Sequence, residues 1–162
     1  MEYKFNLDQL KILNRLVFDA SFDLHIPEDK ILTNTSLQLE LERRTFEKVT
    51  RTKTFFSTKT KLSGQTSIIR FENVSDIHID GFTNNLANDF IDEILIDTNG
   101  KLSIITRTSP VKITMTVTEK TKIYLKDIKE SNFGSGIVGG KSGFTADEWA
   151  LFLKENNYTA DT

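Results

Sequence analysis

The clearest regularity along this chain is an alternation of hydrophobic and polar residues with a period of two. In the segment from Ile68 to Phe82, isoleucines alternate with polar residues in the order Asp76, Ile77, His78, Ile79 and Asp80. An extended backbone puts these two groups on opposite sides, so we expect a strand with one buried and one solvent-exposed face. Gly81 ends the alternation, and we treat this segment as the organising element of the chain.

The same period of two predicts further strands. Asp97 to Gly100 contains an Asn-Gly pair, which suits the tight turn of a hairpin between two of them. The expected strands cover residues 16–26, ended by Pro27, and residues 37–41, 90–96, 102–104, 111–117 and 123–125. Residues 43–61 are rich in Thr and Phe, which favour extended structure, so we expect a long hairpin or exposed ribbon there.

Helix signals occur near both ends. Asn6 and Gln9 have the spacing of a capping box and begin an expected helix at 6–15. Thr145 and Glu148 repeat that spacing at the start of an expected helix at 145–156, after a glycine-rich connector at 134–143. Because the strands follow one another through short turns, we predict a single α+β domain, mainly β, built on a curved antiparallel meander over residues 16–128.

Composition narrows the class of protein. With 38% hydrophobic and 27% charged residues in 162, the chain is long and apolar enough for a globular core. It has no cysteine, which excludes disulfides and thiolate chemistry. We expect a cytoplasmic protein with no membrane partner, because the first residues do not resemble a signal peptide and no apolar run approaches about 20 residues.

Candidate chemistry is weak. Residues 135–142 read Ser-Gly-Ile-Val-Gly-Gly-Lys-Ser, close to a phosphate-binding loop, but only about twenty residues follow, so a flexible linker is the interpretation that we favour. His25 and His78 each share a strand face with aspartates and could form a metal site if their strands were neighbours. Solvent-exposed histidines are the simpler interpretation. We therefore expect no enzyme, catalytic residue, metal or cofactor.

Charge is distributed unevenly. Residues 43–61, the basic segment, carry seven basic residues against Glu47 alone, a net charge of +6. Residues 71–100, the acidic segment, carry seven acidic residues and no Lys or Arg, a net charge of −7. If both segments lie in one sheet they neutralise each other across strands, each exposed pair contributing about 0.5 kcal/mol.

Two functional hypotheses follow from this charge. In the first, the acidic segment binds a cationic protein. Its candidate residues are Asp76, Asp80, Asp89, Asp92, Glu93 and Asp97. In the second, the basic segment binds nucleic acid, with Phe46, Phe55 and Phe56 stacking on bases. Its candidate residues are Arg43, Arg44, Lys48, Arg51 and Lys53. A small-ligand site inside the curved sheet is a third class, and the oligomeric state is left open.

Small β-rich bacterial proteins show a pattern that this chain resembles. Its residues here are Phe71, Val74, Ile77, Ile79, Gly81 and Phe82, followed by Asn85 or Asn88 and the strand from Ile91 to Ile96. Some of these proteins are immunity proteins of polymorphic toxin systems. The similarity covers residues 68–128, mainly at core and turn positions, and the basic segment and the Trp149 helix depart from it. The resemblance implies a bacterial protein that binds a cognate toxin and blocks it without catalysis.

Overall fold

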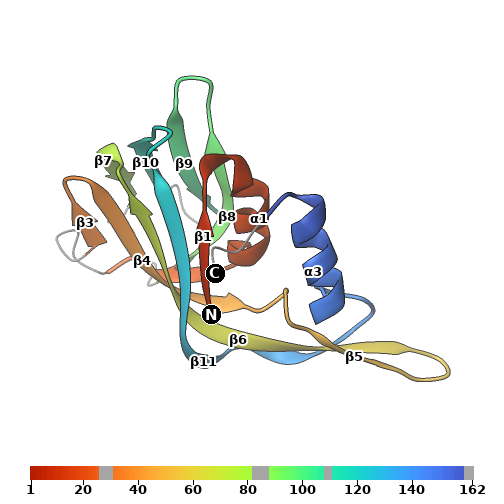
Figure 1. Ribbon diagram of the computed structural model, residues 1–162. Helices are drawn as coiled ribbons and strands as arrows, with labels where there is room; N and C mark the ends of the chain where they lie inside the picture. The colour runs from red at the N-terminus through yellow and green to blue at the C-terminus, as the bar shows by residue number, and fades with distance from the viewer. Residues whose placement is uncertain (26–30, 82–87, 108–110, 159–162) are drawn as a thin grey trace.

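The chain forms a curved antiparallel sheet with one helix near each end (Figure 1). This computed structural model describes residues 1–25, 31–81, 88–107 and 111–158. In these residues eleven strands pair in the order β1-β11-β6-β4-β2-β8-β9-β10-β7, with β3 beside β4 and β5 beside β6. The predicted class, α+β and mainly β, is confirmed.

The elements have these bounds. The strands are β1 (Glu2–Phe5), β2 (Ser21–Asp23), β3 (Leu32–Thr33), β4 (Ser36–Arg44), β5 (Thr50–Lys53), β6 (Thr58–Glu72), β7 (Ser75–Asp80), β8 (Asn88–Ile96), β9 (Lys101–Thr106), β10 (Lys112–Thr116) and β11 (Lys122–Gly139). The helices are the 3-10 turn η1 (Leu7–Gln9), α1 (Leu10–Val17) and α3 (Ala146–Glu155). Pro27, which was expected to end the first strand, and Phe82 and Asn85 of the resemblance lie outside the described residues.

One core joins the two halves of the sheet. Strands β1, β11, β6 and β4 form one half and β8, β9, β10 and β7 the other, with short β2 pairing to both. Buried side chains from both halves belong to a single cluster with those of α1. Helix α1 contributes Leu10, Ile12, Leu13, Leu16 and Val17. Burying these side chains is what holds such a short helix in place, because an isolated helix of this length is not stable.

The expected strand at 16–26 is wrong in its first part. The capping box at Asn6 is present, with the Asn6 amide donating to Gln9 Oε1 at 2.9 Å, and helical structure then continues to Val17. Asp19 adopts a left-handed φ of 62°, and only residues 21–23 form β2. The alternation failed because Leu16 belongs to the last turn of a helix and Phe22 to a strand, yet both face the core. Strand β1 carried no recognised signal.

The meander is local rather than general. Strands β8, β9 and β10 pair consecutively, and the hairpin at Asp97–Gly100 is confirmed, with the Asp97 amide donating to the Lys101 carbonyl and Gly100 at a φ of 75°. Other neighbours are far apart in sequence: β11 lies between β1 and β6. The organising segment is divided at Asn73, since Ile68 to Glu72 ends β6 whereas β7 pairs with β10 at the other edge.

The hairpin expected in the basic segment is also confirmed. Thr50 pairs with Lys61 and Lys53 with Thr58, and the end of β11 pairs along the other side of β6, with Gly139 opposite Lys59. These paired segments, residues 50–62 and 136–139, are called the arm. Figure 1 shows the arm extending away from the rest of the sheet, with α3 lying above its base.

The glycine-rich connector is wrong over residues 134–139, which belong to β11. Glycines carry no side chain to reveal an alternation, so the sequence suggested a linker. Strand β11 passes close to β6 at Gly64, which pairs with Ser131. Only glycine fits at this position, because an added Cβ would lie 2.6 Å from the Ser131 carbonyl oxygen. Most of the segment that resembles a phosphate-binding loop therefore lies in the last residues of an antiparallel strand, and α3 begins only at Ala146.

Candidate binding groove

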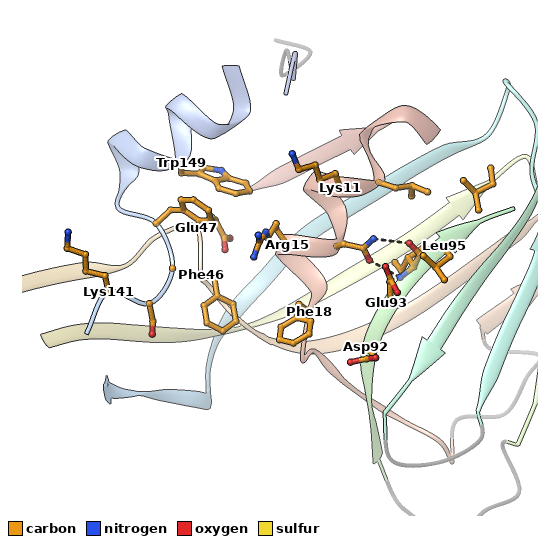
Figure 2. Close-up of a pocket in the computed structure, with 17 residues that line it drawn as sticks. Lys11, Arg15, Phe18, Phe46, Glu47, Asp92, Glu93, Leu95, Lys141 and Trp149 are labelled. Atoms are coloured by element: carbon orange, nitrogen blue, oxygen red, sulfur yellow. Dashed lines mark hydrogen bonds between the residues drawn. The ribbon is translucent and has the colours of Figure 1, made fainter. Parts of the chain in front are cut away.

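A groove of about 940 Å³ lies between α1, β8 and the segment that leads into α3 (Figure 2). Figure 2 shows Phe18 and Phe46 in its middle, Trp149 and Lys141 toward one end, and Asp92, Glu93 and Leu95 toward the other. We call this the binding groove. Its volume falls within the range of ligand sites, roughly 300–1,000 Å³.

Asn14 fixes the distance between the helix wall and the strand wall. Its side-chain amide donates to the Ile94 carbonyl at 2.8 Å, and its carbonyl accepts from the Ile94 amide at 2.7 Å. The side chain thus satisfies both backbone groups of one β8 residue, as a neighbouring strand would. Helix α1 and β8 are therefore joined at one defined position, which keeps the two walls of the binding groove in register.

Gly143 holds the third wall against the body. The Phe144 amide donates to the Phe46 carbonyl at 2.6 Å, and the Val49 amide donates to the Phe144 carbonyl at 3.0 Å. Gly143 has a φ of 65°, and a Cβ there would lie 2.5 Å from the Phe46 carbonyl oxygen. Both the backbone conformation and the close approach therefore require glycine.

Helix α3 docks beside this wall through aromatic side chains. Its capping box is confirmed, because the Thr145 amide donates to Glu148 Oε2 at 2.9 Å. Trp149 packs on Phe144 and Phe152 with ring-centroid distances of 5.5 and 5.2 Å. Such aromatic contacts stabilise by burying large apolar area, with about 0.5–1.5 kcal/mol more from ring geometry.

Behind the binding groove lies a buried network of charges centred on Arg43. Its guanidinium donates to Glu47 at 2.8 Å, to Asp127 at 2.7 Å and to the Ser67 hydroxyl at 3.0 Å. It also reaches the Leu16 carbonyl at the end of α1. Burial alone would lower the pKa of Arg43, but the charges of Glu47 and Asp127 raise it, so the guanidinium is held charged.

Glu47 is the member of this network that also lines the binding groove. It is 1% exposed, and its Oε2 has no hydrogen-bond partner among the described residues. Burial, followed by the charge of Glu47, raises the pKa of the Tyr3 hydroxyl far above its ordinary value, so this phenol stays protonated. The network thus joins β1, β4, β6, β11 and α1 at the base of the arm.

Exposed apolar side chains line the rim of the binding groove. Phe18, Leu95 and Ile96 are 46%, 41% and 40% exposed, although each lies beside the core elements α1 or β8. The helix wall adds the cations Lys11 and Arg15, and the strand wall adds the exposed carboxylates Asp92 and Glu93. An apolar patch with a polar rim is typical of an interaction site.

The six candidate residues of the acidic segment do not form one surface. Asp92 and Glu93 lie in the binding groove, whereas Asp76 and Asp80 lie on edge strand β7, separated from β8 by β9 and β10. Asp89 is fully buried, so it is removed from the candidates. Asp97 stabilises its own turn: hydrogen bonds from the Lys101 and Asn99 amides lower its pKa.

The five candidates of the basic segment are also divided. Arg43 is buried, which removes it from a nucleic-acid surface. The Arg44 guanidinium forms an ion pair with the Asp19 carboxylate at 3.4 Å, and Arg51 binds Glu148 and the Gly143 carbonyl. The remaining two, Lys48 and Lys53, are exposed. The two segments do not neutralise each other as directly paired strands, since β5 and β6 pair with neither β7 nor β8.

The histidines are not brought together. His25 follows β2 and His78 lies in β7, and both are exposed. Within the described ranges, no group of three or more His, Asp or Glu side chains is placed to hold a metal ion. In the same part of the chain, no helix has the length and apolar character needed to cross a bilayer.

Comparison with known proteins adds no relative. No protein-family model matches the chain, and neither a curated protein nor a solved structure is detectably similar to it. The resemblance to immunity proteins therefore stays a hypothesis, and functional arguments rest on the geometry of the binding groove.

Sequence reasoning missed the groove because the residues that line it come from separate parts of the chain: 10–18, 46–47, 92–96 and 141–149. The burial of Arg43, however, could have been predicted from the sequence. It continues the inward row of Leu37, Leu39 and Leu41 at the same period of two, so its side chain points into the protein. A buried arginine requires acidic partners, and Glu47 is the one acid in the basic segment.

Proposed function

We propose that this chain is a non-enzymatic protein-binding domain whose binding groove takes a partly apolar segment of a cationic protein, with a basic side chain of that segment against the β8 wall. The observation that carries this proposal is the combination of exposed apolar side chains on the rim with carboxylates on the β8 wall. Glu93 has no ion-pair partner among the described residues, whereas Asp92 lies 3.5 Å from Arg107. A basic side chain of the partner binds Glu93, and apolar side chains pack against Phe18 and Leu95.

Neutralisation of a toxin is the specific form of this proposal. It rests on the resemblance over residues 68–128 and on the same carboxylates, since complementary charge speeds association and enforces specificity. A polypeptide suits the open rim better than a small ligand does, because a ligand pocket usually buries most of its occupant. Nucleic acid is less well supported, because three of its five candidate residues are buried or paired.

The test begins with retention of proteins from source-cell lysate by the tagged chain after nuclease treatment. The retained protein is then purified, and its affinity is measured by calorimetry for two variants. Asp92→Lys with Glu93→Lys changes the binding groove, and Asp76→Lys with Asp80→Lys changes edge strand β7. The two variants alter the net charge equally, so they separate a local contact from long-range attraction.

We expect the groove variant to lose about tenfold or more in affinity and the β7 variant to lose much less. Equal losses would mean that only overall charge matters, and a loss confined to the β7 variant would move the interface to that edge. Retention that disappears with nuclease would favour nucleic acid instead.

A further inference from the structure

The tip of the arm carries two adjacent phenylalanines that pack on none of the other residues that the structure describes. Phe55 and Phe56 are 99% and 97% exposed, and their rings contact each other at a centroid distance of 5.7 Å. They occupy the centre of a turn closed by Thr54 and Ser57, in which the Thr54 amide donates to the Ser57 carbonyl at 2.8 Å. Such positions usually take Gly, Asn or Asp, so folding does not explain these phenylalanines.

Exposed cations surround this apolar tip. Lys53 pairs with Thr58 and Lys59 with Thr52, so the two lysines point to opposite faces of the hairpin. Both lysines and Lys61 are exposed and have no ion-pair partner among the described residues. The sequence holds no Asp or Glu between residues 48 and 71 or between 131 and 146. Every strand of the arm is therefore free of negative charge.

We propose that the tip of the arm inserts into the interfacial layer of an anionic lipid bilayer, with Phe55 and Phe56 among the upper acyl chains and Lys53 and Lys59 at the headgroups. The spacing fits this arrangement. The lysines are two and three residues from the phenylalanines, which is roughly 7–10 Å along a strand at about 3.3 Å per residue. Apolar faces of interfacial segments lie about 5–10 Å deep.

The dimensions of the tip favour a bilayer over the other partners. Two Phe side chains offer roughly 300–500 Å² of contact area, whereas a stable protein interface buries at least about 1,000 Å². The two rings are tilted by 58° against each other, so they do not form a flat platform on which successive bases stack. Shallow insertion into a bilayer requires neither a large interface nor parallel rings. It also does not require an apolar segment long enough to cross the membrane.

The test is flotation of the full chain with phosphatidylcholine vesicles and with vesicles enriched in phosphatidylserine. Three variants are compared with the wild type. Phe55→Ser with Phe56→Ser removes the apolar tip, and Lys53→Gln with Lys59→Gln removes its charge. Ile128→Ser with Leu151→Ser is the matched control, because it removes two exposed apolar side chains outside the arm. Thermal unfolding of each variant shows that it folds.

We expect binding to phosphatidylserine vesicles that weakens with salt. Loss of the phenylalanines lowers the partition coefficient roughly tenfold or more, each lysine removed lowers it about fivefold, and the control leaves it unchanged. In a separate variant, Phe56→Trp, the emission shifts to the blue when vesicles are added. Equal binding to neutral vesicles, or no loss in the tip variant, would overturn the proposal. Tip-dependent binding of a single-stranded oligonucleotide without vesicle binding would assign the tip to nucleic acid.

Discussion

At the base of the arm, Arg43 is fully buried and binds two carboxylates, whereas at the tip Lys53 and Lys59 are exposed and bind no carboxylate of the described residues. Both sites belong to the same basic segment. The difference follows from where each side chain lies. Arg43 is on the buried face of β4, where acidic side chains can reach it. Lys53 and Lys59 lie in the hairpin, which carries no acidic residue. Arg43 at the base therefore has a structural role, whereas Lys53 and Lys59 at the tip are accessible to a partner.

Aromatic residues show the same contrast. Near the base, Phe144 and Trp149 pack in the cluster that holds α3. At the tip, Phe55 and Phe56 contact each other and are almost fully exposed among the described residues. Removing side chains at the base should lower the free energy of unfolding, and removing them at the tip should leave it nearly unchanged. The predictions below test the structural role of the base, and thermal unfolding of Phe55→Ser with Phe56→Ser tests the tip.

The largest expected effect is that of Arg43→Met. It leaves Glu47 and Asp127 buried without their cation, which should lower the free energy of unfolding by about 3–5 kcal/mol. Urea denaturation followed by Trp149 fluorescence measures this change, since the chain has one tryptophan. Arg44→Met is the matched control: its ion pair with Asp19 is partly exposed, so it should cost about 1 kcal/mol or less.

Equal losses in the two arginine variants would contradict the role that we assign to the strand face, because the two residues are adjacent in β4 and differ in burial. They would mean that the buried network is no more important than a surface ion pair, and that the strand face of Arg43 does not decide its role.

A smaller loss is expected for Gly143→Ala. Its φ of 65° is strained for alanine, and the new Cβ would press on the Phe46 carbonyl, so the free energy of unfolding should fall by about 1–3 kcal/mol. Gly140→Ala is the control, because Gly140 has a φ of 84° with nothing within 4 Å of its added Cβ. The difference between them, measured by denaturation, isolates the contact that holds the third wall of the groove. Equal losses in the two glycine variants would show that the close contact between Gly143 and the Phe46 carbonyl does not hold this wall.

Local signals predicted local structure well. The capping boxes at Asn6 and Thr145 and the hairpin at Asp97–Gly100 depend on residues three or four apart, and each is present. The alternation in β4 and β7 was also visible, because period two follows from the pleat itself. These signals suffice for the fold class.

Long-range structure was not predictable in the same way. The pairing of β11 with β1 and β6 leaves no mark in any single segment, and the glycines at 134–139 concealed the strand. Arg43 meets Asp127 across 84 positions in sequence, so its burial could be suspected but its partner could not be named. The binding groove was missed for the same reason, since Asp92 and Glu93 had been assigned to a protein surface and Phe46 to a nucleic-acid surface, and nothing in the sequence joined them.

The smallest expected effect concerns the ion pair between the arm and α3. The Thr145 amide, followed by the Arg51 guanidinium, lowers the pKa of Glu148 below its ordinary 4.5. In Arg51→Met this pKa should rise toward 4.5 but stay below it, because the hydrogen bond from Thr145 remains. A pH titration of the Glu148 side-chain carboxyl by NMR measures the shift, and Arg70→Met, whose ion pair is with Glu72, should leave it unchanged.

The sign of the linked stability follows from this direction. Because the folded pKa of Glu148 lies below the unfolded value, its contribution is present above about pH 4.5 and is lost as the pH falls through the folded pKa. Arg51→Met should therefore flatten the part of the stability profile below pH 4.5. A Glu148 pKa that is the same with and without Arg51 would mean that helix capping alone lowers the pKa of this carboxyl, and that the ion pair with Arg51 adds nothing to it.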